Sequence, residues 1–80
     1  MIAVSMTVNR REVLRQVGQN IRRERTRLGL SQEKLGFVAG VHRNYVGFVE
    51  RGECSITIIS IVKLARALRV PAYRLFKGVA

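Results

Sequence analysis

The stretch QEKLGFVAGVHRNYVGFVER, residues 32–51, decides the fold. It contains two short helical segments joined across residues 39–41, a link too tight for an ordinary antiparallel helical hairpin. A helix-turn-helix, whose helices meet at about 90–120°, needs a small residue where they approach and a residue that tolerates positive φ in the turn. Gly36 and Gly40 stand at these two places, and four apolar residues can seal the angle between the helices: Leu35, Val41, Val46 and Val49. The pattern therefore predicts a helix-turn-helix.

Four segments of the chain begin with the same local pattern. Asn9, Ser31, His42 and Thr57 are polar capping residues, and each follows an apolar residue that has a second apolar residue five positions further on. This hydrophobic staple sets the angle at which a chain enters a helix. It predicts helices that begin at residues 10, 32, 43 and 58 and end near residues 28, 38, 51 and 69. Pro71 can open a short fifth helix.

Apolar spacing completes the fold class. Two stripes at helical spacing are expected to face inward: Leu14, Val17, Ile21 and Leu28 on the first helix, and Ile61, Leu64, Ala65 and Leu68 on the fourth. No segment shows the alternation of a β-strand. The chain is therefore predicted to be all-α, with residues 9–80 as a single domain and residues 1–8 as a flexible N-terminal arm.

The composition argues against an enzyme. The 80 residues include five glutamates, no aspartate, one histidine (His42) and one cysteine (Cys54). So few Cys and His residues cannot build a zinc shell, and no glycine-rich phosphate loop is present. We therefore expect no metal and no cofactor. A lone cysteine suits a reducing cytoplasm, and the longest apolar run, residues 56–62, is far too short to cross a bilayer.

The charge points to a polyanionic partner. Fifteen Lys and Arg residues oppose the five glutamates, which gives a formal net charge of +10. Apolar residues make up 48% of the chain, too many for a disordered basic tail. A folded domain with this charge indicates nucleic acid first and an anionic membrane surface second.

The run LGLSQEKLGFVAGVHRNYVGFVERG, followed by IVKLARALRVPAYRLF, resembles the phage-repressor/Cro-like helix-turn-helix family of bacterial transcription regulators. Within it, HRNYVGFVERG and the helix led by Thr57 are similar to the small controller proteins of restriction-modification systems, a pattern that short repressors and antitoxins share. The resemblance covers residues 19–76. It implies a five-helix, lambda-repressor-like domain that binds a two-fold operator as a homodimer. Three residues depart from the family pattern: Gly36 in place of alanine, Arg69 in place of glycine, and Ile59 in place of a polar residue.

The resemblance places residues 43–49 in the major groove of DNA. Arg43 and Asn44 begin this helix, and their side chains suit the paired acceptor and donor groups of guanine and adenine. Tyr45 can touch a thymine methyl group or a phosphate, or simply pack. Gly47 allows close approach to the sugar-phosphate wall, and Phe48 is expected to pack against the fourth helix.

A second set of residues is expected to bind phosphates. Such contacts do not distinguish one DNA sequence from another. Ser31 and Gln32 lie at the start of the second helix, where backbone N–H groups attract anions. Lys34 and Arg51 are electrostatic candidates. His42 either caps the third helix or meets a phosphate.

Two further groups have structural roles in this interpretation. Arg25 falls on the apolar side of the first helix, and the family pairs this position with the glutamate of the ERG segment, here Glu50. A homodimer interface is expected from apolar residues that the core leaves unused: Ile56, Ile59, Val62 and Tyr73.

The leading hypothesis is a sequence-specific regulator that binds double-stranded DNA and blocks or contacts RNA polymerase. The alternative is an antitoxin-type interaction module that uses the same apolar surface to bind a toxin and autoregulates its operon. Nonspecific binding of RNA or membranes explains the charge but not the arrangement of Gly36, Gly40 and the apolar residues beside them.

Overall fold

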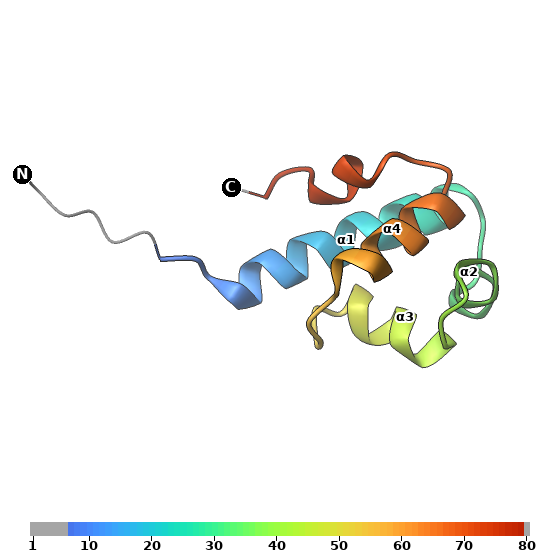
Figure 1. The fold of residues 1–80 in the computed structure, drawn as a ribbon, viewed down its shortest axis with the longest axis horizontal. Coiled ribbons are helices and arrows are strands. Elements are labelled where there is room, and N and C mark those ends of the chain that lie inside the picture. Colours follow the sequence, from blue (N-terminus) through green and yellow to red (C-terminus); the bar gives the residue numbers. More distant parts are fainter. Residues whose placement is uncertain (1–6, 80) are drawn as a thin grey trace, which may run out of the picture.

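The computed structural model describes residues 7–79 of the chain. Within this range the chain forms four α-helices, one 3-10 helix and no strand (Figure 1). The elements are α1 (Arg10–Arg27), α2 (Gln32–Ala39), α3 (Arg43–Glu50), α4 (Ile58–Ala67) and the 3-10 helix η1 (Ala72–Phe76). The predicted all-α class is confirmed. Residues 1–6 of the expected N-terminal arm lie outside the described residues.

The expected capping residues set the helix starts. Asn9 Oδ1 accepts from Glu12 N (3.1 Å), Ser31 Oγ from Lys34 N (2.9 Å), His42 Nδ1 from Asn44 N (3.0 Å) and Thr57 Oγ1 from Ser60 N (3.0 Å). Each bond satisfies one of the backbone N–H groups that a helix start leaves unpaired.

The helix ends differ slightly from the expectation. Glycines with positive φ follow α1 and α2, at Gly29 (70°) and Gly40 (75°). After α4 the same left-handed turn falls to Arg69 (φ 60°), so α4 ends at Ala67 rather than near residue 69. The fifth helix is a 3-10 helix of five residues, closed by bonds such as Arg74 N to Pro71 O (3.0 Å). A segment of five residues can form few of the hydrogen bonds of an α-helix, and short segments of this kind commonly adopt the 3-10 form.

The core lies where the four α-helices and η1 meet. It is built from both expected stripes together with the residues that seal α2 against α3: Val17, Ile21, Leu35, Ala39, Val46, Val49, Ile61, Leu64, Ala65, Leu68 and Leu75. Two members of the predicted stripe on α1 do not belong to it: Leu14 is half-buried outside the core, and Leu28 is 37% exposed. Because α1 ends at Arg27 and the chain turns at Gly29, the side chain of Leu28 lies beyond the helix face that packs inward.

The long helix α1 organises the other elements. It lies between η1 on one side and α3 on the other, while α4 packs against α2 and η1 (Figure 1). Gly18 lets α3 come this close, because a Cβ atom there would lie 2.7 Å from the carbonyl oxygen of Glu50 and closer still to that of Val49. Asn20, buried on α1, donates to the carbonyl oxygens of Leu75 and Lys77 (both 2.8 Å) and ties down the C-terminal segment.

Candidate nucleic-acid interface

The pair α2 and α3 has the geometry of a helix-turn-helix. A Cβ atom on Gly36 would lie 2.7 Å from the carbonyl oxygen of Val41, so the small residue stands where the turn passes closest to α2. Gly40 takes the left-handed conformation that ends α2. Leu35 and Val46 are fully buried in the angle between the helices. The turn therefore holds α3 across the end of α2, with its outward face free.

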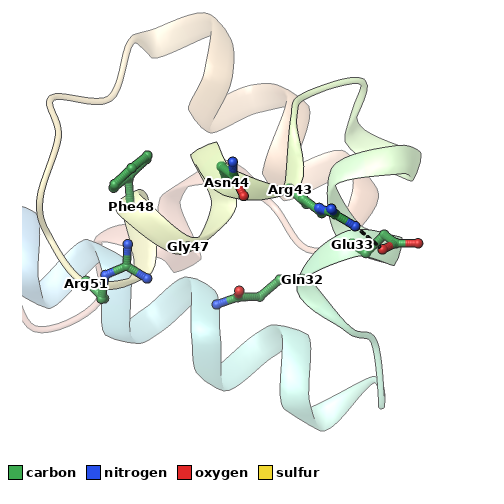
Figure 2. A pocket seen from close by; sticks show the side chains of 7 residues that line it. All are labelled: Gln32, Glu33, Arg43, Asn44, Gly47, Phe48 and Arg51. Carbon is green, nitrogen blue, oxygen red and sulfur yellow. Dashed lines mark hydrogen bonds and ion pairs between the residues drawn. The ribbon is translucent and has the colours of Figure 1, made fainter.

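A groove of about 390 Å³ opens between the start of α2 and the outward face of α3 (Figure 2). It is lined by Gln32, Glu33, Arg43, Asn44, Gly47, Phe48 and Arg51. Five of these seven residues are ones that the sequence proposed for contact with DNA. Glu33 and Phe48 are the additions.

The two proposed base-reading residues at the start of α3 are exposed. Asn44 points outward (Figure 2), and the Arg43 guanidinium, 62% exposed, forms an ion pair with Glu33, with Nη1 2.7 Å from Oε2. The sequence analysis missed Glu33 because its place beside Arg43 depends on the angle between α2 and α3. Tyr45 is half-buried and packs against the core.

Gly47 lies on the floor of the groove. A Cβ atom there would be 3.1 Å from Arg51 Nη1 and 3.4 Å from Gln32 Oε1, so these two side chains extend over it from opposite sides. Phe48, which is expected to pack against α4, is not among the residues of the hydrophobic core. It is 45% exposed, and its ring lies under the Arg51 guanidinium at 5.2 Å, a cation–π contact.

The proposed phosphate-binding residues make contacts within the protein. Ser31 and His42 use their side chains as helix caps. The ammonium group of Lys34 lies 5.6 Å from the ring of Phe37, which is 81% exposed. Arg51 Nε donates to Glu53 Oε1 at 2.9 Å. Lys34 and Arg51 nevertheless remain exposed, so a phosphate can reach both.

A buried ion pair holds α3 in place. Arg25 Nε and Nη2 donate to the two carboxylate oxygens of Glu50 (2.6 and 3.0 Å), and Nη1 donates to the carbonyl oxygen of Leu30 (2.8 Å). Gln32 Nε2 completes the set by donating to Glu50 Oε1 at 3.1 Å. The hydrogen bonds that Arg25 donates to the Glu50 carboxylate raise the pKa of Arg25. The network joins α1, α3 and the start of α2.

Every glutamate of the chain has an arginine partner. The pairs are Glu12–Arg15, Glu24–Arg27, Glu33–Arg43, Glu50–Arg25 and Glu53–Arg51. Ten of the fifteen basic residues therefore have no carboxylate partner among residues 7–79. Arg43 and Arg51, the two arginines of the groove, are among the five that have a glutamate partner.

The residues proposed for a dimer interface lie around α4 and η1. Ile59 and Tyr73 are 65% and 75% exposed, while Val62 and Ile56 are half-buried. Ile58, which the sequence analysis did not single out, is 80% exposed. Because η1 packs against α4, the two exposed groups belong to adjacent elements.

Two kinds of site find no support among residues 7–79. No three His, Cys, Asp or Glu side chains gather there in a way that could hold a metal ion. None of the helices in that range combines the length and the apolar character that a membrane crossing needs.

Comparison with known proteins identifies the family. A model of the helix-turn-helix family matches residues 21–75. The control protein C.SmaI of Serratia marcescens is 39% identical over 59 residues, 74% of this chain and 70% of that protein. The control protein C.BamHI of Bacillus amyloliquefaciens is 39% identical over 54 residues, 66% and 67% of the two chains. The crystal structure of the restriction-modification controller protein C.AhdI from Aeromonas hydrophila is 48% identical, covers 79% of this chain and 96% of its own, and superposes with a TM-score of 0.78.

Proposed function

Because the chain belongs to the helix-turn-helix family of transcriptional regulators, which are DNA-binding proteins and not enzymes, we propose that it is the controller protein of a restriction-modification system. In this proposal it binds a two-fold DNA operator as a homodimer. The observation that carries the proposal is the exposed start of α3, where Arg43 and Asn44 stand on the outward face of a helix held across the end of α2.

Arg43 and Asn44 read base edges in the major groove. Arginine pairs with guanine O6 and N7, and asparagine pairs with adenine N6 and N7. The ion pair of Arg43 with Glu33 does not prevent this, because an exposed pair contributes only about 0–1 kcal/mol, whereas a bidentate base contact is worth about 1–3 kcal/mol. Gly47 serves the site indirectly, by leaving room for Arg51 and Gln32.

Phosphate contacts position the protein at both ends of α3. At the start of α2, the unpaired backbone N–H groups of Ser31 and Gln32 and the ammonium group of Lys34 face one strand. His42 offers its ring at the start of α3, and Arg51 its guanidinium at the end.

The homodimer forms through Ile59, Val62 and Tyr73, with Ile56 at the edge. Such an interface presents two copies of α3 about 34 Å apart, which matches two half-sites one turn of DNA apart. The proposed interface also buries Ile59 and Tyr73, two large apolar side chains that are exposed in the monomer.

The test is selection of bound duplexes from a random pool, followed by binding measurements with two variants. We expect a two-fold symmetric site. Arg43→Ala loses about 1–3 kcal/mol at one base position of each half-site, whereas Arg51→Ala weakens operator and random DNA alike.

Three outcomes count against parts of the proposal. A pool bound without preference refutes sequence-specific regulation. Equal losses on operator and random DNA for Arg43→Ala refute its base-reading role. A chain that stays monomeric at high concentration and yet selects one sequence indicates a missing protein partner, as expected for an antitoxin.

A further inference from the structure

Two arginines at the start of α1 have no role in the site described above. Arg10 and Arg11 occupy the first turn of the helix, and both are exposed. Among the described residues neither has a carboxylate partner, because Glu12, the acidic residue of that turn, is paired with Arg15 (Nη2–Oε1, 2.5 Å). Stability of the helix does not account for them, since basic residues oppose the positive end of the helix dipole.

The fold brings this turn close to the loop that follows the C-terminal end of α3. Arg10 Nη2 donates to Ser55 Oγ in the loop between α3 and α4. In the same loop, Gly52 packs so closely on α1 that a Cβ atom there would lie 3.0 Å from the backbone of Arg15. Figure 1 shows the start of α1 and this loop at the same end of the molecule. We call Arg10, Arg11 and Ser55 the flanking patch.

The position of the patch suits the second edge of the major groove. An α-helix with its side chains is about 10–12 Å in diameter and fills the major groove, which is about 12 Å wide, so α3 in the groove lies between the two phosphate backbones. The start of α2 lies beside the first residues of α3, and the flanking patch lies just beyond its last ones. The two edges of the groove are the two phosphate backbones, so these flanks can face one strand each.

The charges around the groove show what such a patch would supply. Arg43 and Arg51 are each compensated by a glutamate, and of the remaining proposed phosphate ligands only Lys34 carries a full positive charge. The family match begins at residue 21, so the flanking patch is made partly from chain outside it.

We propose that the flanking patch binds DNA phosphates on the strand that borders the C-terminal end of α3. Arg10 and Arg11 supply the charge, and the Ser55 hydroxyl, which accepts a hydrogen bond from Arg10, orients its guanidinium. The assignment rests on the proposed function, because it requires α3 to lie in the major groove.

The experiment compares the salt dependence of binding. Affinity for the selected operator and for a random duplex is measured from 100 to 400 mM NaCl with the unaltered chain, Arg10→Gln, Arg11→Gln, the double variant and Arg10→Lys. Arg74→Gln is the matched control, since Arg74 is exposed on η1, across α1 from α3 (Figure 1). Far-ultraviolet circular dichroism checks that each variant is folded.

Each lost phosphate contact should reduce the slope of log K against log[salt] by about 0.9. A homodimer carries two copies of the patch, so we expect the double variant to lose between about 2 and 4 units of slope on both duplexes and to keep its base preference. Arg10→Lys should retain the slope, because it retains the charge, and the control should match the unaltered chain.

The flanking patch and the proposed function fail in different ways. If the double variant keeps the full slope while Arg43→Ala still loses base preference, the patch is refuted and the regulator stands. If the unaltered chain selects no sequence, the regulator is refuted, and the slope on random DNA decides the patch alone. A loss of slope in the Arg74→Gln control as large as in the double variant also refutes it, since any surface charge would then serve.

Discussion

Two of the glycines that lie inside helices, Gly18 and Gly47, are expected to respond to alanine in opposite ways. At Gly18, on α1, the added methyl group would lie under 3.0 Å from three backbone atoms of α3, in Val49 and Glu50. At Gly47, on α3, it would meet the ends of two flexible side chains, Arg51 at 3.1 Å and Gln32 at 3.4 Å. Backbone atoms within a helix cannot give way, whereas these side chains can rotate.

The two substitutions share one favourable contribution, which makes them a matched pair. Replacing glycine by alanine in a helix interior gains about 1 kcal/mol of helix propensity. Overpacking costs about 1–3 kcal/mol, and it arises only at Gly18. Gly47→Ala should therefore raise the free energy of unfolding by up to about 1 kcal/mol. The free energy of unfolding of Gly18→Ala should be about 1–3 kcal/mol lower than that of Gly47→Ala, because the gain in helix propensity is common to both variants.

Thermal unfolding followed by circular dichroism at 222 nm, with urea titration alongside, measures the difference. For a domain of this size each kcal/mol moves the melting temperature by about 4–8 °C, so Gly18→Ala should melt at least about 4 °C below Gly47→Ala. The more stable Gly47→Ala should bind the operator more weakly, because its methyl group displaces Arg51 and Gln32. Equal melting temperatures for the two variants would refute the close crossing of α1 and α3.

The remaining predictions concern a turn, the buried ion pair and self-association. Arg69→Gly should raise the free energy of unfolding, measured by urea titration, by about 0.5–1 kcal/mol. A non-glycine residue with positive φ costs about 1–2 kcal/mol, and the larger conformational entropy that glycine loses on folding offsets part of the gain. A less stable variant contradicts this prediction. Glu50→Gln should lower the free energy of unfolding by up to about 3–5 kcal/mol, because it leaves the partly buried Arg25 without a counter-charge. A loss below about 1 kcal/mol shows that the pair does not hold α3. Raising NaCl from 50 to 500 mM should tighten the homodimer in sedimentation equilibrium while it weakens DNA binding. Residues 54–80 contain five basic and no acidic residues, among them Lys63 and Arg66 near the interface, so salt screens the repulsion between the two protomers. A dimer that loosens with salt argues against this surface.

The helix starts and the turn could be predicted because short stretches of sequence determine them. A cap needs one side chain and a backbone N–H two or three residues away, as at Ser31 and Lys34. The left-handed turn at Gly40 depends on that residue alone. The end of α4 was placed too late because the turn there is made by Arg69, whose side chain gives no sign of positive φ.

The composition of the groove could be predicted only in part. Residues at the start of α3 were found because their position on one helix is enough to expose them. Glu33 and Phe48 were not found, since Glu33 meets Arg43 only across the angle between two helices, and the exposed ring of Phe48 lies under the Arg51 guanidinium. The buried polar residue Asn20 was missed for the same reason, because it bonds to a segment more than fifty residues away.

The distribution of charge separates selectivity from affinity in this chain. In the groove, each arginine that can reach DNA is already paired with a glutamate, so it must exchange that partner for a base or a phosphate and gains only the difference. In the proposed complex, a wrong base at Arg43 offers less than Glu33 does, so the arginine returns to its ion pair and the loss on a wrong base stays small. Apart from Lys34 on α2, the uncompensated charge lies elsewhere, on α1 and from α4 onward, where it attracts any duplex equally. A net charge of +10 therefore need not make the groove itself adhesive, because Glu33 and Glu53 lower the net charge that its two arginines present to DNA.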